Sequence, residues 1–226
     1  MSIPVNRVRW TSAYRIIPSR FPPIGLFEKV ADPADLEAVF ELEAMTNDRI
    51  RDEVGDITLV PPEDRVSGLG SSPIMAAFTH LRPGGDRFAD GSHGAFYCAK
   101  SLDTAIAETK YHRTRFLAAT NEPPQEVDMR VYRVAFDTRL HDIRGRQQRM
   151  ADIYAPNDYA ASQALGRKLR GEGANGLVYS SVRHTGGECA ALFRPRMVRE
   201  CTQERHLAYV WDGNAITMVY VRSLLD

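Results

Sequence analysis

The sequence predicts an α+β fold: a single domain with a mixed, largely antiparallel β core flanked by helices. Short apolar segments occur together with amphipathic ones, but without the regular βαβ order of a doubly wound sheet. Three C-terminal apolar segments, CAALF, HLAYVW and ITMVYV, are separated by polar turns, which is typical of antiparallel strands. The phosphate-loop pattern GxGxxG, which would favour a parallel dinucleotide-binding sheet, is absent.

The amino-acid composition bounds the class of protein. With 226 residues, 43% of them hydrophobic and 26% charged, the chain has the size and balance of one globular domain, so residues 1–226 are taken as a single domain. Its 29 basic side chains balance 29 acidic ones. Neither direct nucleic-acid binding nor attraction to an anionic membrane surface is therefore expected.

Cysteines and apolar runs indicate the cellular compartment. Cys98, Cys189 and Cys201 are odd in number and lack CxxC spacing, which predicts neither a disulfide framework nor a thiolate zinc site. No segment approaches the roughly 20 apolar residues that a membrane helix requires. We therefore expect a cytoplasmic protein with reduced thiols.

The first half of the chain contains one predicted scaffold helix and a long loop region. Residues 32 to about 54 are predicted to be helical, with Asp32 as N-cap and Pro33 at the first helical position. Residues 55–91 are rich in Gly, Pro, Ser and Asp and surround the apolar run IMAAF, which predicts loops around one short buried element. Loops of this length often carry function.

A strand followed directly by a helix is predicted next. The apolar segment GAFYCA, residues 94–99, indicates a buried strand, and Ser101 is a suitable N-cap for the helix SLDTAIAETKYHRTRFLAA. Glu108 falls roughly 110° from the centre of the apolar stripe at 100° per residue, so it is expected at the margin, where a side chain can border a cleft. The stripe comprises Leu102, Ile106, Thr109, Arg113, Phe116 and Leu117.

The rest of the chain is predicted to add further strands and one helix. The segment RVYRVAFD alternates as a half-buried strand, and a helix is predicted from about Asp158 to Arg170. The dipeptide NG then turns the chain into the strand LVYSS. The tetrapeptide WDGN predicts a tight turn within a β-hairpin over about residues 205–222.

The segment from Gly84 to His112, GGDRFADGSHGAFYCAKSLDTAIAETKYH, carries residue types suited to chemistry. It places Arg87 in a loop, Tyr97 in the following strand and Glu108 in the helix. An arginine can grip a pyrophosphate through its planar fork, an aromatic ring can stack on nicotinamide, and a carboxylate can stabilise positive charge on a ribose. These residue types suit the binding of a dinucleotide and the cleavage of a glycosidic bond.

This segment resembles the central motif of RES-domain toxins, a family named for its arginine, glutamate and serine. Two further motifs match in the correct order: AYRIIPSRF, which contains Arg15, and GLVYSSVRHTGGECAALFRP, which contains Ser181. The resemblance covers the chain from about Arg15 to Val198. It implies a fold similar to ADP-ribosyltransferases, NAD+ as substrate, the role of toxin in a bacterial toxin-antitoxin pair, and an Xre-type antitoxin as partner.

The resemblance also implies roles for individual residues. Glu108 would stabilise the ribosyl cation, Tyr97 would stack on nicotinamide, and Ser181 would orient the ribose. Arg87 and Arg15 would hold the NAD+, with a phosphate or the ribose as the contact of Arg15. The expected catalytic residues are Arg87, Tyr97, Glu108 and Ser181, and the expected NAD+-binding residues are Arg15, Arg87, Tyr97 and Ser181.

The implied reaction is cleavage of the nicotinamide glycosidic bond, with water, phosphate or a protein side chain as acceptor of the ADP-ribose. The chain would be an NAD glycohydrolase or phosphorylase that depletes NAD+, or a mono-ADP-ribosyltransferase that modifies a cellular protein. Turnover of free NAD+ is slightly favoured. The alternative from another class is a noncatalytic module that binds a partner protein, in which the motif residues only maintain the fold.

Some positions depart from the family pattern. Asp86 separates the two glycines from the arginine, Ala89 stands where many relatives have asparagine, and Ser180 replaces a frequent proline. These departures leave the key residue types in place. They leave open the detailed geometry of the phosphate loop and which molecule accepts the ADP-ribose. Arg20 is a weaker candidate than Arg15 for phosphate contact, because no comparable motif supports it.

Other polar clusters are expected to be structural. Glu108 and His112 share one side of the predicted helix, but no third ligand accompanies them, so no metal is predicted. The basic run of Arg144, Arg146 and Arg149 is expected to be a solvated loop rather than a nucleic-acid site.

Overall fold

The computed structural model of the protein describes residues 2–19 and 55–223. Within these ranges one sheet has the strand order β1-β2-β5-β4-β3-β6-β7. Its strands are β1 (Val5–Pro18), β2 (Phe96–Ala99), β3 (Gln125–Asp142), β4 (Gly176–Ser180), β5 (Glu188–Leu192), β6 (Val198–Trp211) and β7 (Ile216–Arg222). Only β3 and β4 pair in parallel, so the predicted mixed, largely antiparallel α+β core is confirmed. The predicted helix at residues 32–54, and Arg20, lie outside the described residues.

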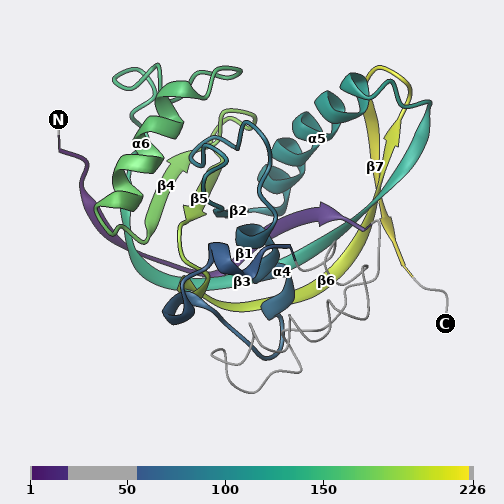
Figure 1. Ribbon diagram of the computed structural model, residues 1–226. Helices are drawn as coiled ribbons and strands as arrows, with labels where there is room; N and C mark the ends of the chain where they lie inside the picture. Colours follow the sequence, from purple (N-terminus) through teal and green to yellow (C-terminus); the bar gives the residue numbers. More distant parts are fainter. Residues whose placement is uncertain (1, 20–54, 224–226) are drawn as a thin grey trace.

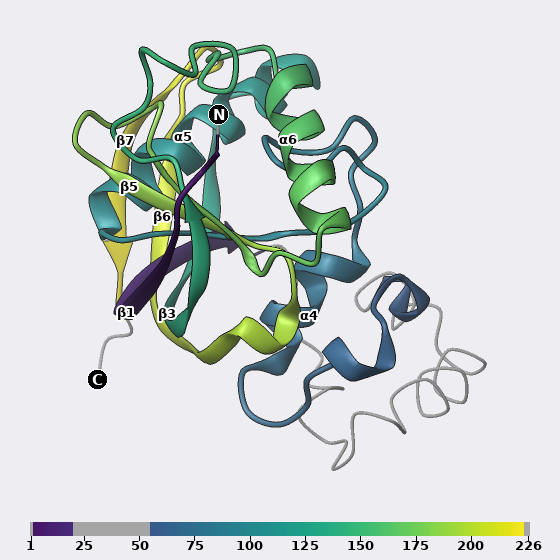
Figure 2. The same ribbon diagram turned by 90° about the vertical axis from the view of Figure 1, so that its left-hand side faces the viewer.

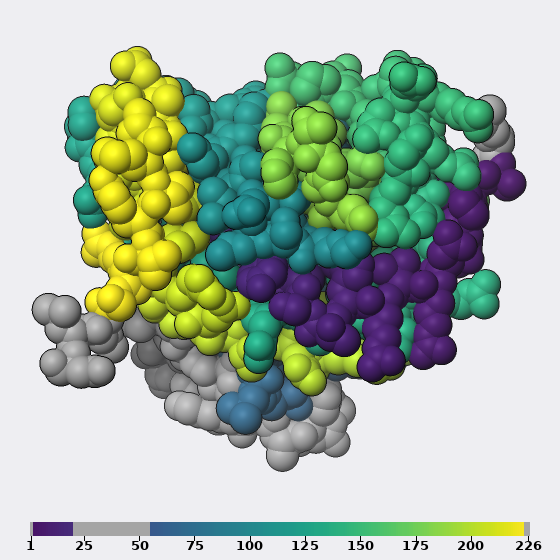
Figure 3. Space-filling view, turned by 180° about the vertical axis from the view of Figure 1, so that it is seen from behind, coloured from purple at the N-terminus to yellow at the C-terminus, as the bar shows by residue number. Residues whose placement is uncertain are grey.

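Strand β1 was not predicted, yet it organises the sheet (Figure 1). It pairs with β3 along almost its whole length and with β2 at Tyr14 and Ala99, which closes β1, β2, β5, β4 and β3 into a ring of pairings. Val8 and Trp10 point into the core and alternate with exposed arginines, which is the period of two of a β-strand. The strand was not recognised from the sequence because the arginines interrupt its apolar residues. Seen from behind, this strand and the C-terminal hairpin both lie at the surface (Figure 3).

The helices are α4 (Ser71–Thr79), α5 (Leu102–Ala119) and α6 (Ala160–Gly171), and short 3₁₀ helices occur at Ile57–Leu59, Pro62–Asp64 and Pro195–Met197. The run IMAAF lies in α4. The predicted N-cap of α5 is confirmed, because the Ser101 hydroxyl accepts a hydrogen bond from the backbone N–H of Thr104 at 3.3 Å. The predicted helix after residue 158 is confirmed as α6, shifted by one or two residues at each end.

The sheet separates two apolar clusters, one under α4 and the other under α5 and α6. Successive residues of β2 point to opposite faces. Phe96 and Cys98 join the cluster of α4, whereas Ala99 joins the cluster of α5, against which Tyr97 also packs. The alternation of this short strand therefore turns the predicted tyrosine toward the helix that carries Glu108.

The apolar stripe predicted on α5 is wrong at one position. Ala105 and Leu117 are buried, but Phe116 is 47% exposed. Near its C-terminal end α5 packs against β7, and Leu117 rather than Phe116 joins the core cluster there. Glu108 is half-buried, at the margin of the packed face as expected.

Helix α6 holds the turn that carries the predicted arginine (Figure 2). Gln163 Nε2 donates hydrogen bonds to the backbone oxygens of Gly84 and Asp86, at 2.8 and 3.1 Å. Gly166 lies directly on the turn, since a Cβ at this position would stand 2.1 Å from the backbone oxygen of Phe88. The glycine therefore permits backbone contact between the helix and the turn.

We expect Gly166→Ala to lower the free energy of unfolding by about 1–3 kcal/mol, because the added methyl group pushes α6 away from Phe88. Gly171→Ala is the matched control in the same helix, since nothing lies within 4 Å of its Cβ position. That change should be neutral or stabilise by up to about 1 kcal/mol. Denaturant unfolding of both variants measures the difference, and equal stabilities would contradict the close contact.

Candidate active site

A cavity of about 360 Å³ lies between α4, α5 and the strands β1 and β2. Four of the five predicted site residues line it: Arg15, Arg87, Tyr97 and Glu108. Ser181 is not part of this lining, but its hydroxyl contacts Glu108 directly. The structure therefore brings together residues from all three sequence motifs.

Arg15 lies where β1 leaves β2. The two strands pair only at Tyr14 and Ala99, and just beyond that point Arg15 Nη1 donates to the backbone oxygen of Tyr97 at 3.0 Å. The guanidinium carbon lies 4.6 Å from the ring centroid of Phe96. Burial lowers the pKa of Arg15, and its buried Nε has no hydrogen-bond partner among the described residues. The Nη1 group of Arg15 therefore holds β1 against β2, and its Nε–H group stays unpaired among the described residues.

Arg87 lies in a tight turn that Asp86 and Ala89 close. The backbone N–H of Asp86 donates to the oxygen of Ala89 at 2.6 Å. Gly85 precedes the turn with φ of 69°, and a Cβ there would stand 1.9 Å from the Ala89 oxygen. Two of the three departures from the family pattern, Asp86 and Ala89, are thus the residues whose backbones close this turn.

The Arg87 side chain is anchored rather than solvated. The residue is 8% exposed, and its Nη1 donates to the backbone oxygens of Ile153 and Ala155 at 3.2 and 2.9 Å. Its guanidinium also lies over the ring of Tyr159, 4.6 Å from the centroid. Arg87 therefore ties the turn to the loop before α6 while it lines the cavity.

Tyr97 links its strand to the same turn. Its hydroxyl oxygen accepts a hydrogen bond from the backbone N–H of Phe88 at 2.9 Å. Burial raises the pKa of Tyr97 far above its usual value, so the phenol stays neutral. The half-buried ring lines the cavity on the side of α5.

Glu108 and Ser181 form the central contact of the site. Ser181 Oγ donates to Glu108 Oε1 at 2.6 Å and accepts the backbone N–H groups of Arg183 and His184 at 3.1 and 3.0 Å. Because two N–H groups occupy the acceptor positions of the hydroxyl, its single proton is directed at the carboxylate. The geometry makes Ser181 a positioning residue for Glu108, and its contact with a ribose stays a prediction.

A second set of contacts holds the turn after Ser181. The guanidinium of Arg183 stacks on Tyr111, 3.3 Å from the ring centroid, and donates to the backbone oxygen of Pro156. Tyr111 in turn donates its hydroxyl proton to Asn157 Oδ1 at 2.5 Å. These contacts connect α5, the serine turn and the loop before α6.

The cavity also contains ionisable residues that the sequence did not assign to the site. Arg82, Arg113, His80 and His112 line it, so that four arginines face two carboxylates, those of Asp86 and Glu108. Ala105, Glu108, Thr109, His112 and Arg113 follow one another at helical spacing on α5 and share one face. Their helical spacing could have indicated a polar, cavity-facing side of α5. It was not recognised because Thr109 and Arg113 had been assigned to the apolar stripe of the same helix.

Glu108 and His112 were expected to be a structural pair, but both line the cavity. Burial lowers the pKa of His112, and the nearby carboxylate of Glu108 offsets part of this shift. A lowered pKa keeps the imidazole neutral near pH 7, and a neutral imidazole can accept a proton.

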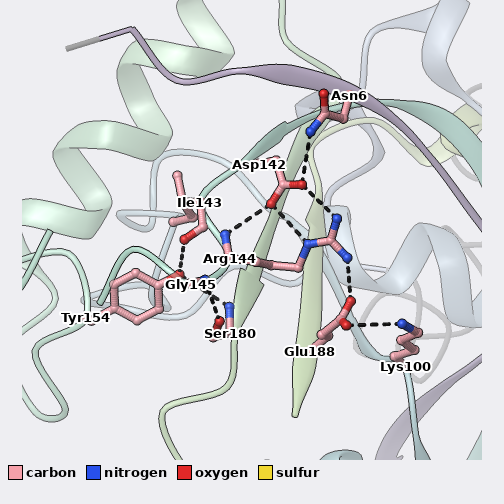
Figure 4. A network of polar contacts seen from close by, with 9 residues as sticks. All are labelled: Asn6, Lys100, Asp142, Ile143, Arg144, Gly145, Tyr154, Ser180 and Glu188. Atoms are coloured by element: carbon pink, nitrogen blue, oxygen red, sulfur yellow. Dashed lines mark hydrogen bonds and ion pairs between the residues drawn. The ribbon is translucent and has the colours of Figure 1, made fainter. Parts of the chain in front are cut away.

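A polar network braces the strand ends next to Ser181 (Figure 4). Arg144 binds both carboxylate oxygens of Asp142, with distances of 3.0 and 2.7 Å, and Glu188 Oε2 at 2.5 Å. Lys100 donates to the other oxygen of Glu188 at 3.1 Å, and Asn6 donates to Asp142 at 3.1 Å. The expectation that Arg144 belongs to a solvated loop is therefore wrong, because carboxylates at the ends of β3 and β5 both bind its guanidinium.

Charge pairing in this network shifts three pKa values. Hydrogen bonding to Asp142 raises the pKa of Arg144 above its usual value. Burial alone would raise the pKa values of Asp142 and Glu188. The hydrogen bonds and charge of Arg144, together with Asn6 at Asp142 and Lys100 at Glu188, outweigh burial, so both pKa values end below their usual values. All three groups are therefore charged at neutral pH.

Ser180 connects this network to the serine turn. Its backbone N–H donates to the Tyr154 hydroxyl at 3.3 Å, and its Oγ accepts the N–H of Gly145 at 3.1 Å. The Tyr154 hydroxyl itself donates to the backbone oxygen of Ile143 at 2.6 Å. Proline at position 180 would remove the first two of these contacts.

Over residues 2–19 and 55–223, no group of three or more His, Cys, Asp or Glu side chains is placed to hold a metal ion. In the same ranges no helix combines the length and apolar character needed to cross a membrane. Cys98, Cys189 and Cys201 are buried, and none of them forms a disulfide bond with another described residue.

Fold and cavity together define a mixed α+β domain with an arginine-rich cavity around a serine-bound glutamate. The chain belongs to the RES domain family, whose model matches residues 62–212. Arg87, Tyr97, Glu108 and Ser181 lie inside the matched region, and Arg15 lies before it. The family expected from the sequence motifs is confirmed.

Two further similarities accompany the family match. The uncharacterized protein y4oC of Sinorhizobium fredii (strain NBRC 101917 / NGR234) is 32% identical over 209 residues, which cover 92% of this chain and 86% of that protein. The crystal structure of the M. tuberculosis MbcT-MbcA toxin-antitoxin complex shares 11% identity with a TM-score of 0.43, covering 88% of this chain and 86% of the other. A similarity this distant indicates nothing about activity.

We expect Arg144→Gln to lower the free energy of unfolding at pH 7 by about 1–2 kcal/mol, because two carboxylates lose their cation. Both carboxyl pKa values are depressed, so their stabilising contribution is present above the unfolded pKa of about 4 and is lost as the pH falls through the folded values. Denaturant unfolding at pH 7 and pH 3 should show the gap to the wild type shrinking in acid.

Arg149→Gln is the matched control for this measurement, since Arg149 is exposed and belongs to the same basic run. It should change stability by less than about 0.5 kcal/mol at either pH. A gap for Arg144→Gln that stayed constant between the two pH values would exclude the proposed charge pairing.

Proposed function

We propose that the chain cleaves the nicotinamide glycosidic bond of NAD+ and acts as the toxin of a bacterial toxin-antitoxin pair. The observation that carries the proposal is the Glu108 carboxylate, held by Ser181 beside a cavity in which arginines outnumber carboxylates. Such a cavity suits a ligand that combines anionic phosphates with a ribose whose anomeric carbon becomes cationic. Membership of the RES family supports the same proposal.

The cleavage step needs little acid catalysis, because nicotinamide leaves as a neutral molecule. When the bond between the ribose C1′ and the ring nitrogen breaks, both electrons go to the nitrogen and the positive charge passes to the ribose. The negative charge of Glu108, fixed in position by Ser181, stabilises this cation. The accessible face of Tyr97 can pack against the departing ring.

The acceptor then forms a bond to C1′. Water gives ADP-ribose and releases one proton, for which the neutral imidazole of His112 is a suitable base. Phosphate would give a phosphorylated ADP-ribose, and a protein side chain would give an ADP-ribosylated target. We favour turnover of free NAD+, because its depletion would account for the growth inhibition expected of a toxin.

The proposed partner is an antitoxin of the Xre type, as the resemblance to RES-domain toxins implies. Basic and acidic residues are equal in number in this chain. DNA binding by a complex of the two proteins would therefore come from the antitoxin.

Incubation of the purified chain with NAD+ carrying an isotopic label in its adenylate part should release nicotinamide and yield labelled ADP-ribose. Glu108→Gln keeps the size and the hydrogen bond of the side chain but removes the charge, so we expect nicotinamide release to fall at least about 100-fold. Parallel reactions with phosphate, and with cell lysate, identify the acceptor. Label retained on a protein band indicates a transferase.

Thermal unfolding and growth assays complete this experiment. Glu108→Gln should melt at nearly the wild-type temperature and should no longer inhibit growth. If a folded wild-type chain releases no nicotinamide under any of these conditions, the enzymatic proposal is wrong. If Glu108→Gln stays fully toxic, the chain acts as a noncatalytic binding module.

Ser181→Ala should lower kcat for nicotinamide release by about 10- to 100-fold with little change in KM, because it removes a hydrogen bond to a charged group. Ser181→Thr keeps a hydroxyl and should recover part of the activity. Steady-state kinetics over a range of NAD+ concentrations separates the two constants. A rise in KM at constant kcat would instead indicate that Ser181 binds the substrate.

A further inference from the structure

We infer that Arg113 and Arg82 form a phosphoryl-binding subsite in the cavity, placed so that a dinucleotide runs along α5 with its ribose at Glu108 and its pyrophosphate toward Arg113. The inference deepens the proposed function and rests on it for the identity of the ligand as a dinucleotide. The anion-binding property of the subsite stands on the structure alone.

Arg113 is placed for this role by the helix itself. Glu108 and Arg113 both line the cavity and are five residues apart on α5, which separates them by about 7.5 Å along the helix axis at 1.5 Å per residue. Measured from its anomeric carbon, a ribose together with its 5′ carbon and the attached pyrophosphate spans a distance of this order. A ligand whose anomeric carbon faces Glu108 can therefore place its phosphates near Arg113.

The guanidinium of Arg113 has no acidic partner among the described residues. It lies over the ring of Phe116, with its central carbon 5.1 Å from the ring centroid. Burial lowers the pKa of Arg113, and the charge of Arg82 lowers it further. Two like charges thus face the same cavity. An anion between them would relieve their repulsion, and a phosphoryl group matches the planar fork of each guanidinium.

The other two arginines of the cavity have fewer donors to offer. Arg87 Nη1 and Arg15 Nη1 are already hydrogen-bonded to backbone oxygens. The charge of Arg82 is matched only by a long contact with Asp86, at 3.5 Å, and its side chain is 60% exposed. Arg82 and Arg113 are therefore the lining arginines that can reorient toward a ligand at least cost in existing contacts.

The test measures binding of ADP-ribose and of inorganic pyrophosphate by calorimetry in phosphate-free buffer. Arg113→Gln should weaken both ligands by about 10- to 100-fold, as expected for lost hydrogen bonds to a charged group. It should also raise KM for NAD+ more than it lowers kcat. Lys110→Gln is the matched control, since it removes one positive charge from the same helix outside the cavity lining. This variant should bind both ligands like the wild type.

Adenosine binding, which involves no phosphate, and thermal unfolding show whether Arg113→Gln is only misfolded. Arg82→Gln provides a second, exposed variant that should weaken the same two ligands. Unchanged affinity for ADP-ribose and pyrophosphate in both variants would overturn the subsite. Equal losses for adenosine and ADP-ribose would overturn it as well, because the effect would then not depend on phosphate.

The outcomes separate the subsite from the proposed function. If pyrophosphate binding depends on Arg113 but the wild type releases no nicotinamide, the subsite stands and the proposed function fails. If nicotinamide release is normal and Arg113→Gln leaves KM unchanged, the function stands and the subsite fails. If Arg113→Gln affects only stimulation by inorganic phosphate, the subsite holds an acceptor phosphate, and the proposed path of the dinucleotide is overturned.

Discussion

The hydrogen bond between Ser181 and Glu108 is the contact on which the site depends. It joins α5 to the turn after β4 at 2.6 Å and fixes the carboxylate without neutralising it. Ser181 is the donor in this bond, because two backbone N–H groups occupy the acceptor positions of its hydroxyl. A negative charge held at a fixed point needs no reorganisation when positive charge develops beside it, which is the property that electrostatic catalysis uses.

The arginines of the cavity divide into two kinds according to their contacts. Arg87 and Arg15 donate to backbone oxygens and hold the turn and the sheet edge in place. Arg82 and Arg113 lie in the same lining with few contacts of their own. The pair that is bonded to the backbone gives the cavity its shape, and the pair with fewer contacts gives it an excess of positive charge that can adapt to an anion.

The walls of the site are held mainly by polar contacts between loops and strand ends. The network around Arg144 secures the ends of β3 and β5, and Ser180 links it to the turn that contains Ser181. Helix α6 contacts the turn that carries Arg87 through Gly166 and Gln163. Loops that carry function are thus fixed by neighbours from distant parts of the chain, which is how irregular segments reach defined positions.

The sequence by itself determined the features that depend on neighbouring residues. The N-cap of α5, the buried strand β2 and the order of Arg87, Tyr97 and Glu108 follow from the local sequence, and the structure has the predicted strand and helix in this unit. Only the tertiary structure decided that Ser181, 73 residues from Glu108, bonds to it, and that β1 closes the sheet. Periodicity shows which side of an element faces inward but not which distant segment lies opposite. The role of Arg113 could be inferred only once its helix face met the cavity.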